Sequence, residues 1–294
     1  MSLRPGKYLA LSGIDYSQKS PAQIRELFRQ TLEEGMHGLC YSAYEEGQKP
    51  GDNITMDQVR RRMAIIAPYT KWVRSFSCIE GNEFIPQAAR EFGLKTLVGA
   101  WLGKDKDLNE QEIEGLISLA KNGHVDIAAV GNEVMYRKDL TEDELLGYMY
   151  RVKEALPGVP VGYVDAYYEF SHRPKITEAC DVVLANCYPF WESCHMDYSL
   201  MYMKQMYQQA VQAANGKKVI ITETGWPSQG QDHDGAEPSA ENFMKYFINA
   251  QLWSKQDGIE MFYFSSFDES WKVGAEGDVG AYWGIWDMHG NLKF

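Results

Sequence analysis

Short apolar runs alternate with amphipathic stretches along most of this 294-residue chain. An apolar run of about four to eight residues that ends at Gly, Pro or a polar residue is typical of a buried β-strand. The longer stretches place apolar residues three or four positions apart, which is typical of helices. Strands that alternate with helices form βα units and a parallel sheet. With this many units, the pattern predicts a closed (β/α)8 barrel.

Nine segments qualify as strands, one more than such a barrel needs. The predicted strands are Tyr8–Tyr16, Gly38–Tyr44, Trp72–Cys78, Thr96–Trp101, Asp126–Asn132, Pro160–Val164, Val182–Asn186, Lys218–Thr222 and Met261–Phe267. The predicted helices are Ala22–Glu34, Met56–Ala67, Phe84–Phe92, Asn109–Asn122, Thr141–Leu156, Leu200–Ala214 and Ala240–Ser254.

Helix starts are marked by local sequence. Ser20 with Pro21 predicts the start of the first helix. Capping boxes, in which a polar residue is followed three positions later by Glu, are predicted at Asn109 and Thr141.

We expect one domain, because no linker, repeat or low-complexity run interrupts the chain. Residues 1–35 are expected to form an N-terminal extension packed on the barrel. The apolar runs are far shorter than the roughly 18 residues of a membrane span. Met1–Gly6 is polar and short rather than a leader. The compartment is therefore secreted or periplasmic if a leader was removed, and otherwise cytoplasmic.

A net charge of −12 and a pI near 5.0 argue against nucleic acid or an anionic membrane as a partner. A neutral substrate is compatible with this net negative charge. We also expect the protein to be a monomer. Aromatic residues make up 13% of the chain, and their flat faces suit sugar rings, although core packing accounts for many of them.

We expect no metal and no cofactor. The five cysteines lack a CxxC pair and are odd in number, so neither a zinc site nor a disulfide framework is indicated. The six histidines show no ligand spacing. Glycine-rich phosphate loops and a GxSxG elbow are also absent from the sequence.

Two predicted strands end in a glutamate. Glu223 follows the apolar run that starts at Val219, and Glu133 follows the run that starts at Asp126. A carboxylate at the end of a buried strand needs partners or a task. For Glu223 alone, a structural salt bridge is an equally good interpretation. Two such glutamates match the paired carboxylates of glycoside hydrolysis.

The motifs around these glutamates resemble glycoside hydrolase family 17, and they follow one another in the family's order over nearly the whole chain. They are GLCYS at 38–42, VGNEV at 130–134, NCYPF at 186–190, ITETGWPS at 221–228, FDESWK at 267–272 and YWGIW at 282–286.

The resemblance implies a (β/α)8 barrel with the acid/base Glu133 after strand four and the nucleophile Glu223 after strand seven. Counting back makes Gly38–Tyr44 strand one and Tyr8–Tyr16 the surplus. A retaining enzyme needs one protonated and one ionised carboxyl. Burial and the like charge of Glu223 are expected to keep Glu133 protonated near neutral pH.

Further roles follow from the resemblance. Asn132 is expected to donate to the sugar 2-OH or to the nucleophile, unless it only forms a turn. Tyr188 is expected to donate to Glu223. Glu269 and Lys272 fit a pair that binds sugar hydroxyls, with a surface salt bridge as the alternative. A further carboxylate is assigned provisionally to Glu276, with Asp278 as competitor. The candidate sugar platforms are Tyr41, Phe190, Trp191, Trp226, Trp271, Trp283 and Trp286, of which Tyr41 and Trp226 have the best positional support and Trp191 is expected on the acceptor side.

One stretch departs from the plant members of the family. Tyr41–Pro50 lacks their YGxxG motif and is closer to microbial relatives. The predicted function is a retaining endo-β-1,3-glucanase. The alternatives are a β-1,3-glucanosyltransferase that uses the same glutamates and, less favoured, a non-catalytic glucan-binding barrel.

Overall fold

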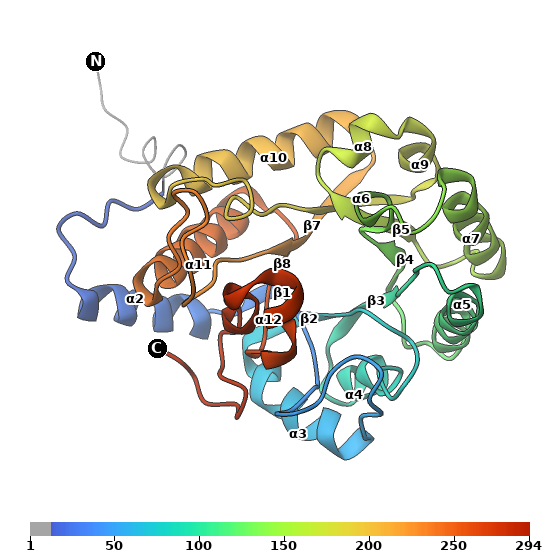
Figure 1. Cartoon of the computed structure of the whole chain (residues 1–294), viewed down its shortest axis with the longest axis horizontal. Coiled ribbons are helices and arrows are strands. Elements are labelled where there is room, and N and C mark those ends of the chain that lie inside the picture. The colour runs from blue at the N-terminus through green and yellow to red at the C-terminus, as the bar shows by residue number, and fades with distance from the viewer. Residues whose placement is uncertain (1–12) are drawn as a thin grey trace.

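The fold is a single closed barrel of eight parallel strands surrounded by helices, as the alternation of strands and helices predicts (Figure 1). The computed structural model describes residues 13–294. The strands pair in chain order, and Leu39 of β1 is in register with both Val73 of β2 and Tyr263 of β8, which closes the barrel. The strands are β1 Met36–Cys40, β2 Thr70–Ser75, β3 Lys95–Ala100, β4 Ile127–Asn132, β5 Val161–Ala166, β6 Val182–Asn186, β7 Lys218–Thr224 and β8 Met261–Tyr263.

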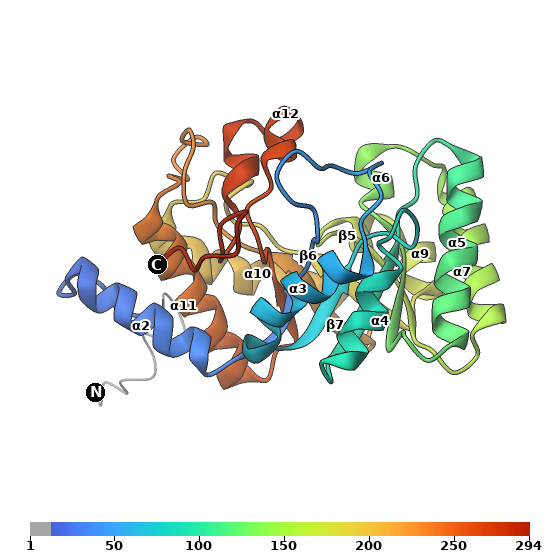
Figure 2. The same cartoon turned by 90° about the horizontal axis from the view of Figure 1, so that it is seen from below.

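Helices connect successive strands and cover the outside of the barrel. They are α2 Pro21–Glu33, α3 Met56–Ile66, α4 Phe84–Glu91, α5 Lys106–Lys121, α6 Val134–Arg137, α7 Glu142–Ala155, α8 Glu169–His172, α9 Pro174–Ala179, α10 Ser199–Ala213, α11 Ala240–Asp257 and α12 Val273–Glu276. Figure 2 shows α6 and α12, which follow β4 and β8, at the same end of the barrel. This is the end at which parallel strands finish and at which barrel enzymes place their chemistry.

Eight of the nine predicted strands are present, and their apolar runs are buried on both faces. Every residue of β4 and of β6 is buried, as expected for parallel strands covered by helices outside and side chains inside. β8 ends four residues earlier than predicted. The N–H of Ser265 donates to the carbonyl of Trp283, so the chain turns toward the C-terminal segment there.

The predicted N-terminal strand is corrected in the part that the structure describes. Residues 8–12 of this segment lie outside the described residues, and residues 13–16 form no strand. The N–H of Ile14 and the hydroxyl of Tyr16 instead donate to the side chain of Asn249 on α11. A closed barrel has no free edge with which a ninth strand could pair.

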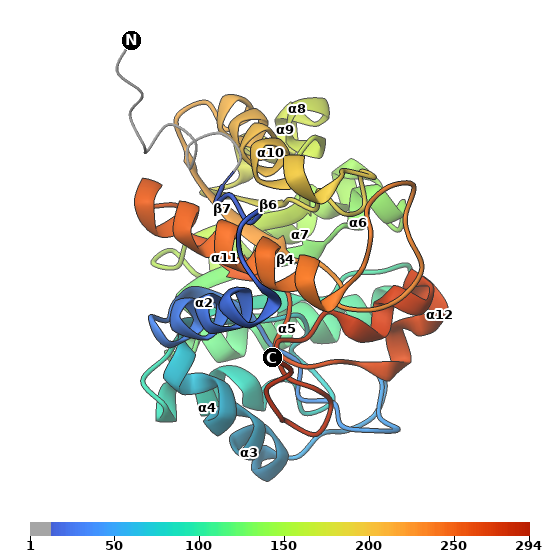
Figure 3. The same ribbon diagram turned by 90° about the vertical axis from the view of Figure 1, so that its left-hand side faces the viewer.

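The described segment before β1 also carries α2, which packs along α11 (Figure 3). The ring centroid of Phe28 lies 4.9 Å from that of Phe247. Helix α2 begins with a capping box between Ser20 and Gln23 and with Pro21 at its first position.

The two predicted capping boxes have different outcomes. Thr141 and Glu144 form the predicted box at the start of α7. The box at Asn109 is wrong, because α5 begins earlier, after its N-cap Asp105. Asn109 lies inside α5, and its amide exchanges two hydrogen bonds with the backbone of Gly103.

No helix among residues 13–294 has the length and apolar character that crossing a membrane requires.

Candidate active site

The two strand-end glutamates meet in one cavity at the C-terminal end of the barrel. Glu133 directly follows β4, and Glu223 lies near the end of β7. Both line a cavity of about 520 Å3. Residues from the segments after β4, β5, β6 and β8 form its walls. Among them are Tyr136, Tyr168, Tyr188, Trp191, Glu276 and Trp283.

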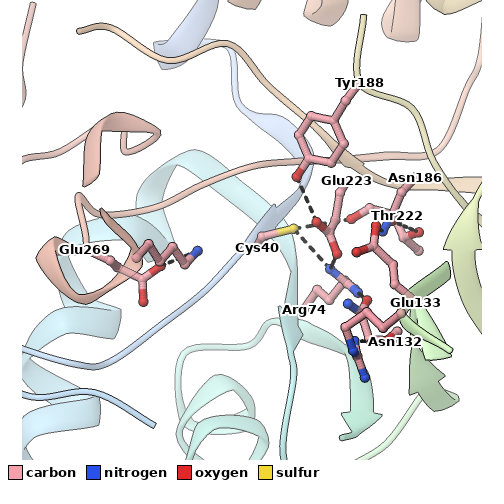
Figure 4. Close-up of polar contacts among 11 residues, drawn as sticks. Cys40, Arg74, Asn132, Glu133, Asn186, Tyr188, Thr222, Glu223 and Glu269 are labelled. Carbon is pink, nitrogen blue, oxygen red and sulfur yellow. Dashed lines mark hydrogen bonds and ion pairs between the residues drawn. The ribbon is translucent and has the colours of Figure 1, made fainter. Parts of the chain in front are cut away.

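Glu223 has a donor on each carboxylate oxygen (Figure 4). Arg74 Nη1 donates to Oε1 over 2.7 Å, and the Tyr188 hydroxyl donates to Oε2 over 2.7 Å. The hydrogen bond from Tyr188 is the one that the resemblance implies. The side chains of Arg74 and Glu223 are only 2% and 8% exposed. This buried ion pair fixes the orientation of the Glu223 carboxylate.

Arg74, from β2, is held in place by several other groups. Its Nη2 donates to Asn132 Oδ1 over 2.6 Å, and its guanidinium lies 4.2 Å from the ring centroid of Phe76. Burial is the largest single effect on Arg74 and lowers its pKa, but the charges of and hydrogen bonds to Glu223 and Cys40 together outweigh burial, so the arginine pKa is raised. Since the oxygen of Asn132 is occupied, its Nδ2 is the group that remains to donate elsewhere.

Glu133 has no cation in direct contact among the described residues. Its Oε1 accepts a hydrogen bond from Asn186 Nδ2 over 2.9 Å. The Thr222 hydroxyl donates to Asn186 Oδ1, which fixes the orientation of that amide. Burial and, next, the charge of Glu223 raise the pKa of Glu133 to about 7, while the bond from Asn186 acts in the opposite direction.

The two carboxyls therefore have different surroundings. Glu223 has a guanidinium and a hydroxyl as donors, whereas Glu133 has a neutral amide as donor and a raised pKa. A retaining glycosidase needs such a difference between its two carboxyls.

Glu269 and Lys272 form a buried ion pair of 2.7 Å, so the alternative of a surface salt bridge is wrong. Trp271 Nε1 donates to Glu269 Oε1 over 3.0 Å. Burial alone would lower the pKa of Lys272, but Glu269 raises it. Lys272 Nζ also lies 4.1 Å from the ring centroid of Phe264, which lines the cavity.

Glu276, rather than Asp278, reaches the cavity. Burial raises the pKa of Glu276 to about 6, Lys272 opposes this effect, and Glu269 adds to it. Asp278 is exposed and accepts a hydrogen bond from the backbone of Gln231.

Two of the predicted platforms line the cavity. Trp191 is 37% exposed. Trp283 is only 2% exposed and packs against Trp191 and Phe190.

The structure corrects the expectation for Tyr41, Phe190, Trp226 and Trp286, because all four are buried and present no open face to a sugar. The hydroxyl of Tyr41 donates to the carbonyl of Val59, and Trp226 Nε1 donates to that of Glu237. Phe190 packs beneath Trp191, and Trp286 packs against Phe267 and Tyr69. These four rings are part of the packing around the cavity and do not line it. Trp271 is partly buried and packs edge-on against Tyr44.

Sequence reasoning missed several site residues. Arg74 is the most important, and an arginine inside a predicted buried strand is a signal that was available. Asn186 belongs to a recognised motif but received no role. The cavity-lining side chains that carried no signal are Tyr136, Tyr167, Tyr168 and Glu192.

The five cysteines are free thiols, four of them buried. Within residues 13–294, no group of His, Cys, Asp and Glu side chains is arranged to hold a metal ion.

Comparison with protein families gives one match that covers most of the chain. The model of the BtgE/BtgC glycoside hydrolase domain matches residues 38–284. Among curated proteins, the glucan 1,3-beta-glucosidase BGL2 of Candida albicans is 27% identical over 280 residues, covering 86% of this chain and 91% of the relative. The glucan 1,3-beta-glucosidase of Saccharomyces cerevisiae is 25% identical, covering 86% and 89%.

Among solved structures, a Rhizomucor miehei β-1,3-glucanosyltransferase in complex with laminaritriose superimposes with a TM-score of 0.79. It is 30% identical, and the match covers 89% of this chain and 96% of that one. A plant β-glucan endohydrolase matches with a TM-score of 0.62 at 17% identity, which shows the shared fold.

Proposed function

The chain belongs to the BtgE/BtgC glycoside hydrolases of family 17, and from this premise we propose that it cleaves β-1,3-glucan by double displacement through Glu223 and Glu133. The observation that carries this proposal is the contrast between the two carboxyls. The Glu223 carboxylate is paired with Arg74 and Tyr188, while the Glu133 carboxyl has only the neutral Asn186 as a hydrogen-bond partner among the described residues.

In the first step, the Glu223 carboxylate attacks the anomeric carbon and Glu133 gives its proton to the departing glycosidic oxygen. The bond from carbon to that oxygen breaks as the ester to Glu223 forms. In the second step, Glu133 takes a proton from the incoming hydroxyl, whose oxygen displaces Glu223. Both glutamates return to their starting states.

Four other side chains are assigned to the substrate. Asn132 Nδ2 donates to the 2-OH of the sugar at the reacting carbon, since its oxygen is occupied by Arg74. The ion pair of Glu269 and Lys272 shapes the sugar-binding wall near Phe264. Trp191 stacks on a sugar of the acceptor.

A second candidate function is glycosyl transfer, in which the hydroxyl of another glucan replaces water in the second step. The likeness to a glucanosyltransferase and the exposed aromatic face of Trp191 support it. The two outcomes differ by the relative binding of acceptor and water in one transition state, a matter of a few kcal/mol.

Product analysis on laminarin-type oligosaccharides at low and high concentration tests this assignment. Shorter products alone indicate hydrolysis, and products longer than the substrate indicate transfer. Binding without any change in the oligosaccharide would contradict both and favour a glucan-binding barrel.

Two variants test the roles of the glutamates. Glu223→Gln is expected to abolish turnover and to leave oligosaccharide binding largely intact. Glu133→Ala is expected to impair cleavage of glucan far more than cleavage of an aryl glucoside with an acidic leaving group, which departs without a proton. Turnover of glucan at the wild-type rate by either variant would overturn the proposal.

A further inference from the structure

Glu133 lies in a backbone conformation that only its surroundings can maintain. Its φ of 52° and ψ of 30° are left-handed, a conformation that is unfavourable for a residue other than glycine. The residue joins β4 to the short helix α6. Its N–H donates to the carbonyl of Val164, and its carbonyl accepts from the N–H of Arg137. This turn directs the side chain into the cavity, so whatever fixes the turn also fixes the carboxyl.

Two side chains of β5 hold the segment that follows Glu133. Tyr163 and Asp165 are two positions apart in a strand and therefore point to the same face. The Tyr163 hydroxyl accepts from the N–H of Met135 over 2.9 Å, and Asp165 Oδ2 accepts from the N–H of Tyr136 over 3.3 Å. The Tyr163 hydroxyl in turn donates a hydrogen bond to the Asp165 carboxylate.

Asp165 is anchored to its own strand as well. Its Oδ1 accepts from the N–H of Ala166 over 2.8 Å. Both β5 side chains are at most 1% exposed. Together they form a clamp, defined by Tyr163 and Asp165, that ties the first turn of α6 to β5. Without it, the N–H groups of Met135 and Tyr136 would lose these acceptors.

The charge of Asp165 gives the clamp a second effect. Four groups face the Glu133 carboxyl from the elements packed around it: Glu223 on β7, Asn186 on β6, Asp165 on β5 and Arg137 on α6. Glu223 and Asp165 favour the protonated form, whereas Asn186 and Arg137 favour the ionised form. A neutral capping residue such as Ser would satisfy the same N–H groups without adding this charge.

Asp165 and Glu133 both have raised pKa values. Burial raises the pKa of Asp165 to about 6, with the bonds from Tyr163 and Ala166 acting against burial. Burial raises the pKa of Glu133 to about 7.

We propose that Tyr163 and Asp165 are positioning residues for Glu133, which hold the left-handed turn that directs its carboxyl into the cavity. This inference rests on the proposed role of Glu133 as the acid/base. It adds to the two proposed catalytic glutamates a carboxylate that acts through the backbone around Glu133.

The experiment compares Asp165→Asn with Asp181→Asn as a matched control. Asp181 also accepts a backbone N–H of β5, that of Val161 over 3.0 Å, but at the opposite end of the strand. For each variant, kcat/KM is measured across pH with a laminarin oligosaccharide and with an aryl glucoside that has an acidic leaving group. The melting temperature is recorded alongside.

For Asp165→Asn, we expect kcat/KM on the oligosaccharide to fall about 10- to 100-fold, since small misplacements of a catalytic group have effects of this size. On the aryl glucoside, whose departure needs no proton, we expect a change of less than about 3-fold. The basic limb of the oligosaccharide profile should move to lower pH by about 0.5 to 1, because removing a negative charge makes Glu133 easier to ionise. Asp181→Asn should leave kcat/KM on both substrates, and the basic limb of the pH profile, unchanged.

Tyr163→Phe is the second variant and keeps the carboxylate while removing one anchor of the turn. We expect it to lower kcat/KM on the oligosaccharide more than on the aryl glucoside. An equal loss on both substrates with an unmoved basic limb would mean that the clamp only stabilises the fold, and would overturn the proposal. Failure of the proposed function is distinguishable, because Glu133→Ala would then show no preference for the aryl glucoside.

Discussion

Replacing Arg74 by Met tests whether the buried ion pair of Glu223 organises this site. Methionine preserves much of the apolar stem of arginine but removes the cation. The Glu223 carboxylate, 8% exposed, would then keep only the hydroxyl of Tyr188 as a donor. Removing one partner of a buried ion pair costs about 3–5 kcal/mol, because the remaining charge stays out of water. This is a large part of the roughly 5–15 kcal/mol that stabilises a typical domain.

The assay is urea unfolding at pH 7 of the wild type, Arg74→Met, Glu223→Gln and the double variant. The double variant contains neither charge, so we expect it to be about 2 kcal/mol or more stable than the sum of the single effects predicts. Arg60→Met is the matched control, since Arg60 makes a bidentate ion pair with Glu91 at the surface. An exposed pair of this kind contributes at most about 1 kcal/mol.

Activity provides the second readout. The pair fixes a carboxylate oxygen of Glu223, the proposed nucleophile, and we expect Arg74→Met to lower kcat/KM by about 100- to 1,000-fold, as the loss of one preorganised donor does elsewhere. A coupling free energy below about 0.5 kcal/mol between positions 74 and 223 would refute this reasoning. So would a loss of stability in Arg74→Met no larger than that in Arg60→Met.

Three further predictions concern pH, acceptor binding and helix capping. The pKa of Glu133 is raised to about 7, so its proton persists to higher pH than in an ordinary glutamate. We therefore expect kcat/KM on glucan to fall as pH rises through about 7. A value of kcat/KM that stays constant up to pH 8 would contradict this assignment. Trp191→Ala should lower the ratio of transfer to hydrolysis at high oligosaccharide concentration about 5-fold, the equivalent of roughly 1 kcal/mol of stacking, whereas Trp101→Ala, an exposed tryptophan outside the cavity lining, should not change it. Thr141→Ala, which removes the capping box with Glu144, should lower the free energy of unfolding by about 1 kcal/mol and leave kcat/KM unchanged.

The barrel and the two glutamates were predictable because both signals are local. Each strand is a short apolar run, and alternation with helices leaves few topologies open. Glu133 and Glu223 are adjacent in sequence to the runs that position them. The same locality explains the error at Asn109, where a capping pattern recurred inside a helix. There Asn109 binds the backbone of Gly103, and Glu112 accepts a hydrogen bond from the N–H of Cys78, so both side chains fasten neighbouring loops.

Burial of individual aromatic side chains was not predictable in the same way. Tyr41 and Trp226 follow strands that end at the site, as expected. A position after a strand, however, does not determine whether a ring turns toward the cavity or toward the surrounding packing. Tyr41 turns toward the backbone of α3, where the carbonyl of Val59 accepts a hydrogen bond from its hydroxyl. Only the packing of several distant segments decides between these directions.

The asymmetry between the two glutamates depends on residues that are remote in sequence. Arg74 and Glu223 are 149 positions apart and meet only because the barrel closes. Asn186 is in register with Glu223 on the neighbouring strand, yet it donates to Glu133, so the Glu133 carboxyl receives a neutral partner and the Glu223 carboxyl a charged one. The sequence motifs place a carboxyl at each of two strand ends. The partner that each carboxyl receives is decided by the side chains on β2 and β6 that face them.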